Sequence, residues 1–143
     1  MDRREVIMAA GGALLAGTVG TAFAAEKEHK HDSGMLIQED LARSAADCAR
    51  TGQTTLRLSI NLLEKGDISM AECGRTVQDL VATCEAMMKM ASFGSRHIGP
   101  MAKVVRGVCI ASEKICMKHK EHKECVECAK SCRECANICK KYI

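Results

Sequence analysis

The chain has 143 residues and a formal net charge of +3, which arises from 21 basic and 18 acidic residues spread along the sequence. Ten residues are cysteine and nine are methionine, whereas tryptophan is absent and only one tyrosine and two phenylalanines occur. The length suits a single domain. The small and dispersed charge argues against a nucleic-acid-binding surface, so we expect no nucleic-acid partner.

The first 24 residues have the features of a cleavable export signal. Arg3 and Arg4 give a charged start, a short Gly-rich apolar stretch follows, and Ala22 and Ala24 suit a cleavage site. The stretch is too short for a transmembrane helix, so we expect no membrane insertion after cleavage. The paired arginines partly match a twin-arginine signal, which exports folded proteins. Ordinary secretion and an uncleaved tail are the alternatives, and a periplasmic or otherwise exported location is expected.

Residues 25–34 are polar and aperiodic, which is typical of a flexible tail, and they include His29 and His31. From about Leu36 to Lys65, apolar and small residues recur every three or four positions, which predicts the first helix. Its inward stripe is expected to be Leu41, Ala45, Cys48, Gly52, Thr55, Ser59 and Leu62.

A turn at Gly66 is expected to lead into a second helix over about residues 69–92. Ser69 is predicted to cap this helix, because Glu72 stands three residues later and completes a capping box. The inward stripe of the second helix is expected to be Met70, Cys73, Val77, Leu80, Cys84, Met87 and Ala91.

The third helix is expected to begin around Pro100, which suits a first helical turn, and to extend to about His119. Its inward stripe is expected to be Ala102, Val105, Cys109, Ser112, Cys116 and His119. A polar turn near residues 120–123 precedes the fourth helix, in which cysteines recur in steps of three and four. They are Cys125, Cys128, Cys132, Cys135 and Cys139. This spacing predicts an amphipathic helix whose buried stripe consists of thiols.

Four helices with short connections predict an all-α fold over residues 35–143, an antiparallel up-down-up-down four-helix bundle with a cysteine-lined core. All ten cysteines then face one axis, in two halves. The half near the loop at 94–99 is expected to contain Cys48, Cys84, Cys109, Cys132, Cys135 and Cys139. The other half is expected to contain Cys73, Cys116, Cys125 and Cys128.

A core of Cys, Ala, Ser, Thr and Gly buries little apolar surface, so bound metal is expected to supply part of the stability. Thiolates select Cu(I), Zn(II) or iron–sulfur clusters. A continuous column suits Cu(I) best, because this ion accepts few soft ligands and tolerates bridging thiolates, so all ten cysteines are candidate ligands. Zinc prefers separate closed sites of four ligands, and iron–sulfur clusters prefer cysteines on loops.

Other interpretations of the cysteines stay open. In an exported protein an even number of cysteines also predicts disulfides, although cysteines three apart in one helix are poorly aimed for bridging. A thiol oxidoreductase needs a low-pKa cysteine at a helix N-terminus in a βαβ setting. Only Cys125 is near such an end, and no βαβ pattern occurs. We therefore expect no enzyme, and we keep zinc binding and a disulfide-stabilised structural bundle as alternatives.

The cysteine pattern resembles that of the bacterial copper storage proteins over about residues 35–143. The resemblance rests on Cys73, Cys84, Cys109, Cys116, Cys125, Cys128, Cys132, Cys135 and Cys139. It implies a bundle that stores many Cu(I) ions, often as a tetramer, with a copper donor or acceptor protein as partner, and its exported branch resembles a store for copper-dependent methane oxidation. The first helix departs from richer members because it carries only Cys48, which implies fewer ions, or a detoxifying or delivery role.

The family also uses methionine and histidine at the mouth of the bundle, where thioether is a weak and exchangeable Cu(I) ligand. Near the loop at 94–99 the resemblance implies three accessory metal ligands, which are Met87, Met101 and His97. At the opposite end it implies Met70 and His119. Ordinary core packing or exposure in a turn is the alternative interpretation of these five residues.

Overall fold

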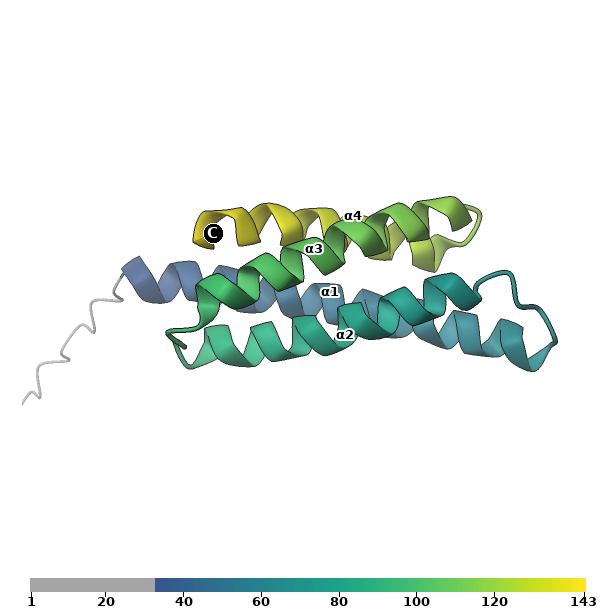
Figure 1. Cartoon of the computed structure of the whole chain (residues 1–143), viewed down its shortest axis with the longest axis horizontal. Helices are drawn as coiled ribbons and strands as arrows, with labels where there is room; N and C mark the ends of the chain where they lie inside the picture. The colour runs from purple at the N-terminus through teal and green to yellow at the C-terminus, as the bar shows by residue number, and fades with distance from the viewer. Residues whose placement is uncertain (1–32) are drawn as a thin grey trace, which may run out of the picture. The chain divides into compact units, whose positions relative to one another are not determined.

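The computed structural model describes residues 33–143, with side chains from Gln38 onward. The export signal expected over 1–24 lies outside the described residues, as does most of the tail expected over 25–34. Every regular element in the described part is helical (Figure 1). These elements are α1 (Ser33–Glu64), α2 (Ala71–Ser92), α3 (Ile98–Cys116), the 3-10 helix η1 (Met117–His119), α4 (Lys123–Cys139) and the 3-10 helix η2 (Lys140–Tyr142).

The four long helices pack side by side as an up-down-up-down bundle (Figure 1). Each helix contacts the next one along the chain, and α4 closes the arrangement by contacting α1. The predicted all-α four-helix bundle is therefore confirmed. None of the helices in residues 33–143 combines the length and apolar character that crossing a bilayer requires.

The start of α2 differs from the prediction that Ser69 caps it. Met70 occupies the N-cap position, and no side chain caps the helix. The backbone N–H of Ser69 instead donates to the Asp67 carboxylate at 2.9 Å. Met70 is fully buried, whereas Ser69 is exposed in the turn. Burial of the Met70 side chain therefore sets where α2 begins, and a capping box is not formed.

The end of the third helix agrees with its predicted position. The α-helical part of α3 ends at Cys116, and the 3-10 helix η1 continues it to His119. The other boundaries follow the sequence signals. Pro100 falls in the first turn of α3, and the turns after α1 and α2 contain Gly66 and Gly94 at φ values of 80° and 68°. Positive φ is readily adopted by glycine, which explains why both helices stop there.

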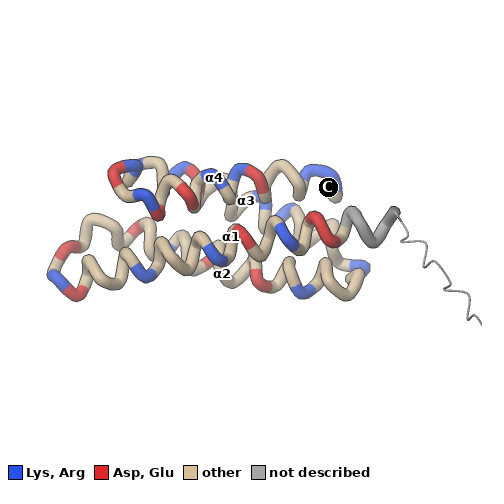
Figure 2. The backbone as a smooth tube through the Cα atoms, turned by 180° about the vertical axis from the view of Figure 1, so that it is seen from behind, with Lys and Arg blue, Asp and Glu red and all other residues tan. Residues whose placement is uncertain are grey.

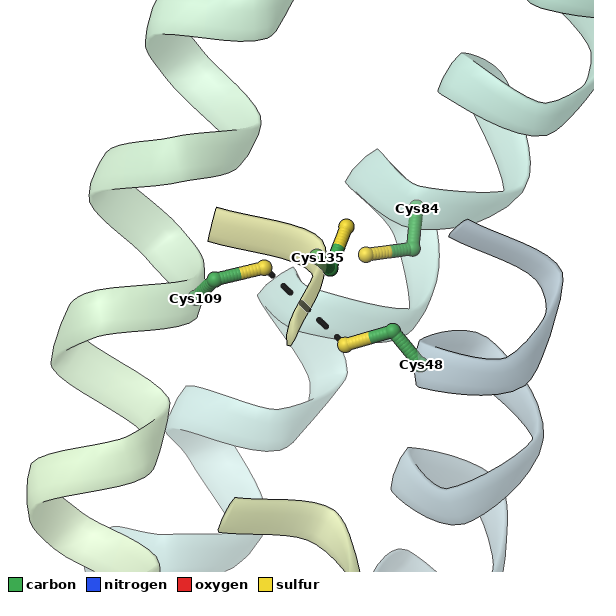
Figure 3. Close-up of side chains that lie close together, drawn as sticks. All are labelled: Cys48, Cys84, Cys109 and Cys135. Atoms are coloured by element: carbon green, nitrogen blue, oxygen red, sulfur yellow. Dashed lines mark hydrogen bonds between the residues drawn. The ribbon is translucent and has the colours of Figure 1, made fainter. Parts of the chain in front are cut away.

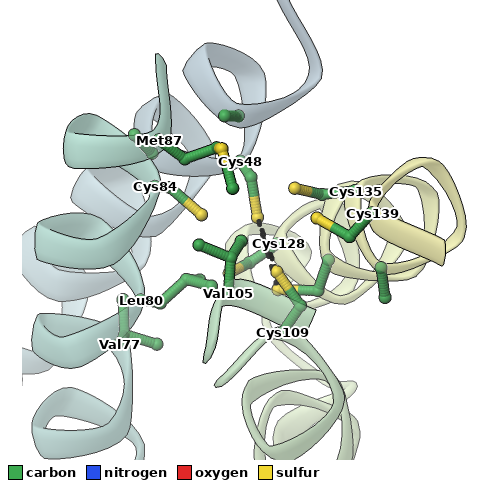
Figure 4. Packing of buried hydrophobic residues seen from close by; sticks show 14 of the residues in the cluster. Cys48, Val77, Leu80, Cys84, Met87, Val105, Cys109, Cys128, Cys135 and Cys139 are labelled. Carbon is green, nitrogen blue, oxygen red and sulfur yellow. Dashed lines mark hydrogen bonds between the residues drawn. The ribbon is translucent and has the colours of Figure 1, made fainter. Parts of the chain in front are cut away.

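The core is a narrow column of small and medium side chains. Its largest fully buried apolar residues include Leu41, Met70, Val77, Leu80, Met87 and Val105. Figure 4 shows four of these residues, Val77, Leu80, Met87 and Val105, packed around cysteines. Leu62, expected on the inward stripe of the first helix, is only partly buried. Because so much of this core is sulfur, methyl and hydroxyl groups, its apolar burial is modest.

Gly52 was expected on the inward stripe of the first helix. It is buried as predicted, and its neighbours are residues of α2. A Cβ atom added there would approach Val81 Cγ2 to 2.9 Å and the nearest atoms of Leu80 and Val77 to 3.4 Å. Real Cβ atoms essentially never make the shorter of these contacts. The absence of a side chain at Gly52 thus allows α1 and α2 to pack closely.

Replacement of Gly52 by alanine is expected to destabilise the bundle, whereas the same change at Gly107 should stabilise it. Both residues lie inside helices, where alanine is favoured over glycine by about 1 kcal/mol. A Cβ at Gly107 meets nothing within 4 Å, but one at Gly52 must displace Val81, and overpacking costs about 1–3 kcal/mol. Urea unfolding of the reduced, metal-free variants measures both effects. Equal stabilisation by the two changes would contradict close packing at Gly52.

Candidate metal centre

All ten cysteines point into the bundle. Each has a relative exposure of 0%, and none forms a disulfide. One comes from α1, two each from α2 and α3, and five from α4. The inward orientation predicted from the three-and-four spacing is therefore observed for every one, and the interior presents a column of free thiols.

Four sulfur atoms converge near the middle of the bundle. The Sγ atoms of Cys48, Cys84, Cys109 and Cys135 all lie within 4.8 Å of one another, and each comes from a different helix (Figure 3). Cys48 Sγ is 3.9 Å from Cys109 Sγ. Four soft ligand atoms from four rigid helices form a preorganised site for a thiophilic ion.

Two more cysteines of α4 extend this site along the axis. Cys132 Sγ lies 3.7 Å from Cys48 Sγ, and the thiol of Cys139 interacts with that of Cys135. Together the two residues and the four converging ones form what we term the six-cysteine group. Its members are Cys48, Cys84, Cys109, Cys132, Cys135 and Cys139. This is the set that the sequence predicted for the half near residues 94–99.

The remaining cysteines form the four-cysteine group, which consists of Cys73, Cys116, Cys125 and Cys128. The Sγ atoms of Cys73 and Cys116 are 3.9 Å apart. The thiol of Cys116 also interacts with those of Cys125 and Cys128. On α1, the residue beside this group is Thr55, which interacts with Cys128. The predicted second half of the column is thus present, and α1 contributes no sulfur to it.

Within the six-cysteine group the thiols stabilise one another unequally. Hydrogen bonds with Cys109 and then Cys132 lower the pKa of Cys48 to about 5. The pKa of Cys135 is also lowered, first by a hydrogen bond with Cys109. The pKa of Cys84 is raised by its hydrogen bonds with Cys109 and Cys135 and by burial. Some thiols are therefore favoured as thiolates, the form that binds metal, while their neighbours keep the proton.

The four-cysteine group shows the same alternation. Hydrogen bonds with Cys116 and Cys125 lower the pKa of Cys73 to about 3. Hydrogen bonds with Cys116 and Cys132 lower the pKa of Cys128 to about 4. The pKa of Cys116 is raised, first by its hydrogen bond with Cys125. Further loss of protons places like charges side by side in a dry core, which a bound cation relieves.

The five accessory residues lie in different surroundings. Met87 and Met70 are fully buried, and Met87 lies beside Cys84 in Figure 4. Met101 is partly buried. His97 is exposed at the N-cap of α3. His119 is mostly buried in η1, with Nδ1 3.7 Å from the Glu121 carboxylate.

Sequence reasoning missed a hydroxyl pair between α1 and α4. Thr51 Oγ1 and Ser131 Oγ are 2.5 Å apart and both are nearly buried. The carbonyl oxygen of Cys48 is within hydrogen-bond distance of the Thr51 hydroxyl, and that of Cys128 is within hydrogen-bond distance of the Ser131 hydroxyl. Because a hydroxyl has one proton, one of the two donates to its carbonyl while the other donates to its partner hydroxyl. Each residue lies three positions after a cysteine, and this spacing was the only feature of the sequence that could have indicated the pair. The pair joins the two helices next to the column.

Basic and acidic residues are interspersed along the helices (Figure 2), and none of those in the described part of the chain is buried. Several form ion pairs on the surface, such as Arg133 with Glu113 at 2.7 Å and Lys118 with Glu72 at 3.2 Å. Such exposed pairs contribute little to stability. In the described residues the charges are therefore separate from the ligand atoms, which are sulfur.

A four-helix bundle whose core is lined by free thiols from every helix defines a class of protein that binds soft metal ions. Residues 35–143 match the family described as copper storage protein. Because this match covers most of the chain, the protein belongs to the copper storage protein family, as its cysteine spacing suggested. Its ligand is copper, and it is not an enzyme. Comparison with curated proteins gave no match.

Proposed function

We propose that the chain is an exported store that holds several Cu(I) ions through its ten core cysteines. The observation that carries this proposal is the burial of all ten free thiols on one axis. The neighbouring sulfur atoms of Cys48 and Cys109, and of Cys73 and Cys116, are 3.9 Å apart. Thiolates at such separations can share ions, so the column suits a cation that accepts few ligands.

Zinc is the second candidate, and one observation favours it. The convergence of Cys48, Cys84, Cys109 and Cys135 provides four sulfur ligands for a closed tetrahedral site. Zinc bound there would leave Cys132 and Cys139 without an ion, although both belong to the same buried group. Cu(I) uses these thiols as bridging ligands, which accounts for more of the column. Membership of the copper storage family supports the same choice.

Export is part of the proposal because residues 1–24 carry the features of a signal. Burial of the thiols is compatible with this location. A thiol with a relative exposure of 0% is inaccessible to an external oxidant, so the folded bundle keeps its cysteines reduced in an oxidising compartment. Transport of the folded chain by the twin-arginine route then protects the thiols before and after export.

Exchange of copper with a donor or acceptor protein requires ligands between the column and solvent. Near residues 94–99, Met87 is buried beside Cys84, Met101 is partly buried and His97 is exposed. Their graded exposure suits stepwise transfer through weak ligands. Met70 and His119 provide a similar pair at the opposite end. The outer face of α3, with Val104 and Ile110 about half exposed, is suited to the homo-oligomer that the family resemblance implies.

Anaerobic titration of the reduced chain with Cu(I), against a chromophoric Cu(I) chelator, tests the proposal. We expect several ions per chain, with sulfur-to-copper charge-transfer absorption that grows until all are bound. Zinc titration should saturate at fewer ions, because each closed site takes four thiols. A stoichiometry of one Cu(I) or less would reject storage. Thiol counting on freshly purified, non-reduced protein should find all ten free, whereas a disulfide-stabilised module would show fewer.

A further inference from the structure

The sulfur column is interrupted between its two groups. On α2, Val77 and Leu80 fill the buried positions between the two cysteines, and on α3 Ser112 does so. On α1, Gly52 is the buried residue that faces Val77 and Leu80. We term these four residues, Gly52, Val77, Leu80 and Ser112, the sulfur-free layer. Three of the four helices therefore contribute no ligand sulfur at this level.

Helix geometry shows how wide the interruption is. At 1.5 Å per residue, the two cysteines of α2, Cys73 and Cys84, are about 16 Å apart along the helix. Those of α3, Cys109 and Cys116, are about 10 Å apart. Both spacings are too long for two thiolates to share one ion. On these helices an ion in one group cannot contact a sulfur of the other group.

Only α4 carries sulfur across the sulfur-free layer. Cys128 and Cys132 are one helical turn apart, about 6 Å along the axis. Their thiols interact with each other. Cys132 Sγ in turn lies 3.7 Å from Cys48 Sγ of the six-cysteine group. The thiols of Cys128 and Cys132 are thus the single link between the groups.

Ser112 marks the layer by a second, independent feature. Its side chain is fully buried, and its Oγ has no hydrogen-bond partner. A buried hydroxyl without a partner is costly, so its retention requires an explanation. Serine differs from cysteine by one atom, and it stands on the stripe between Cys109 and Cys116. Ser112 therefore occupies a ligand position of the column but supplies a hard oxygen, which Cu(I) disfavours.

We propose that the chain binds Cu(I) in two separately exchanging groups divided at Ser112, and that ions cross between them only through the thiols of Cys128 and Cys132. This inference rests on the proposed copper-binding function. In the crossing, the bond from copper to Cys132 sulfur forms and the bond to Cys128 sulfur breaks. Cys132 releases its proton and Cys128 takes one up, so no electron is transferred. The copper bound by one chain is thus divided into two populations that exchange separately.

Release kinetics test this division in the full reduced chain loaded with Cu(I). Addition of excess chromophoric chelator should remove copper in two phases, with the larger amplitude from the six-cysteine group. The double variant Cys73→Ser/Cys116→Ser should lose one phase and keep the other at its original rate. The double variant Cys84→Ser/Cys109→Ser should lose the other phase and keep the first at its original rate. Release in one phase from the unchanged chain would overturn the proposal.

The Ser112→Cys variant provides the gain-of-function test. Sulfur at this position would lie one turn from both Cys109 and Cys116, so the two groups should merge. We expect the two release phases to become one and the copper capacity to rise. Ser131→Cys is the matched control. It adds a thiol at another nearly buried serine, but one whose hydroxyl contacts Thr51 between α1 and α4, so both phases should persist.

The outcomes separate this inference from the proposed function. If the chain binds no more than one Cu(I), the storage function fails and the division fails with it. If the chain binds several ions but releases them in one phase, storage stands and only the division is wrong. Two phases that survive Ser112→Cys unchanged would also contradict the role given to Ser112.

Discussion

Loading with Cu(I) is expected to raise the melting temperature of the reduced chain by about 30 °C. A ligand that binds only the folded state at a thousand times its Kd adds about 4 kcal/mol per site. Two such ions would add about 8 kcal/mol, and each kcal/mol shifts the melting temperature of a domain of this size by about 4 °C. The metal-free core starts from low stability, because cysteines and alanines rather than large apolar residues make up most of it.

Circular dichroism at 222 nm, recorded during heating under anaerobic conditions, measures the shift. Extraction of copper with a chelator should return the melting temperature to the metal-free value. Mg²⁺ serves as the control ion, because a hard cation has little affinity for thiolates and should leave the transition in place. An equal melting temperature with and without Cu(I) would place the bound copper outside the core.

Replacement of both Cys132 and Cys135 by serine is expected to lower the copper capacity by more than the share that two of the ten cysteine ligands represent. Cys135 belongs to the four converging sulfurs and also interacts with Cys139. Cys132 contacts Cys48 and links to Cys128. The double variant therefore breaks the converging site, isolates Cys139 and cuts the link between the groups. The copper capacity from chelator competition should fall by about half, since ions with shared ligands are lost together.

The double variant Ala129→Ser/Ala136→Ser is the control for this experiment. Both alanines are buried on the same helix, and the change adds two hydroxyl groups without removing sulfur. These hydroxyls can bond to carbonyl oxygens one turn back in the helix. Copper capacity should therefore stay at the level of the unchanged chain. A similar loss in both double variants would mean that disturbed packing, and not sulfur ligation, lowers the capacity.

Helical periodicity predicted most of the fold because it is a local property of the chain. Steps of three and four residues placed all ten cysteines on inward faces, and every one is buried. Glycines at positions 66 and 94 marked the ends of two helices. One local signal failed. The capping box predicted at Ser69 is not formed, because at this turn packing of the connected helices outweighs a weak local preference.

Grouping the cysteines into two halves was also within reach of the sequence, because short connections restrict the relative heights of neighbouring helices. The contacts between individual cysteines could not be predicted from the sequence. That Cys48 meets Cys132 at 3.7 Å depends on how α1 and α4, which are far apart along the chain, are shifted along their axes. Side-chain packing determines such shifts, and no repeat in the sequence encodes them.

The spacing of residues along the chain was thus sufficient to establish which residues face the interior, that cysteines line this interior, and that four helices surround it. The folded bundle added what depends on contacts between distant segments. It placed Gly52 against Val81 and paired Thr51 with Ser131. In this bundle the hydroxyl of Ser112 has no hydrogen-bond partner. Periodicity acts over one or two helical turns, whereas the distances between sulfur atoms arise from helices packing together in three dimensions.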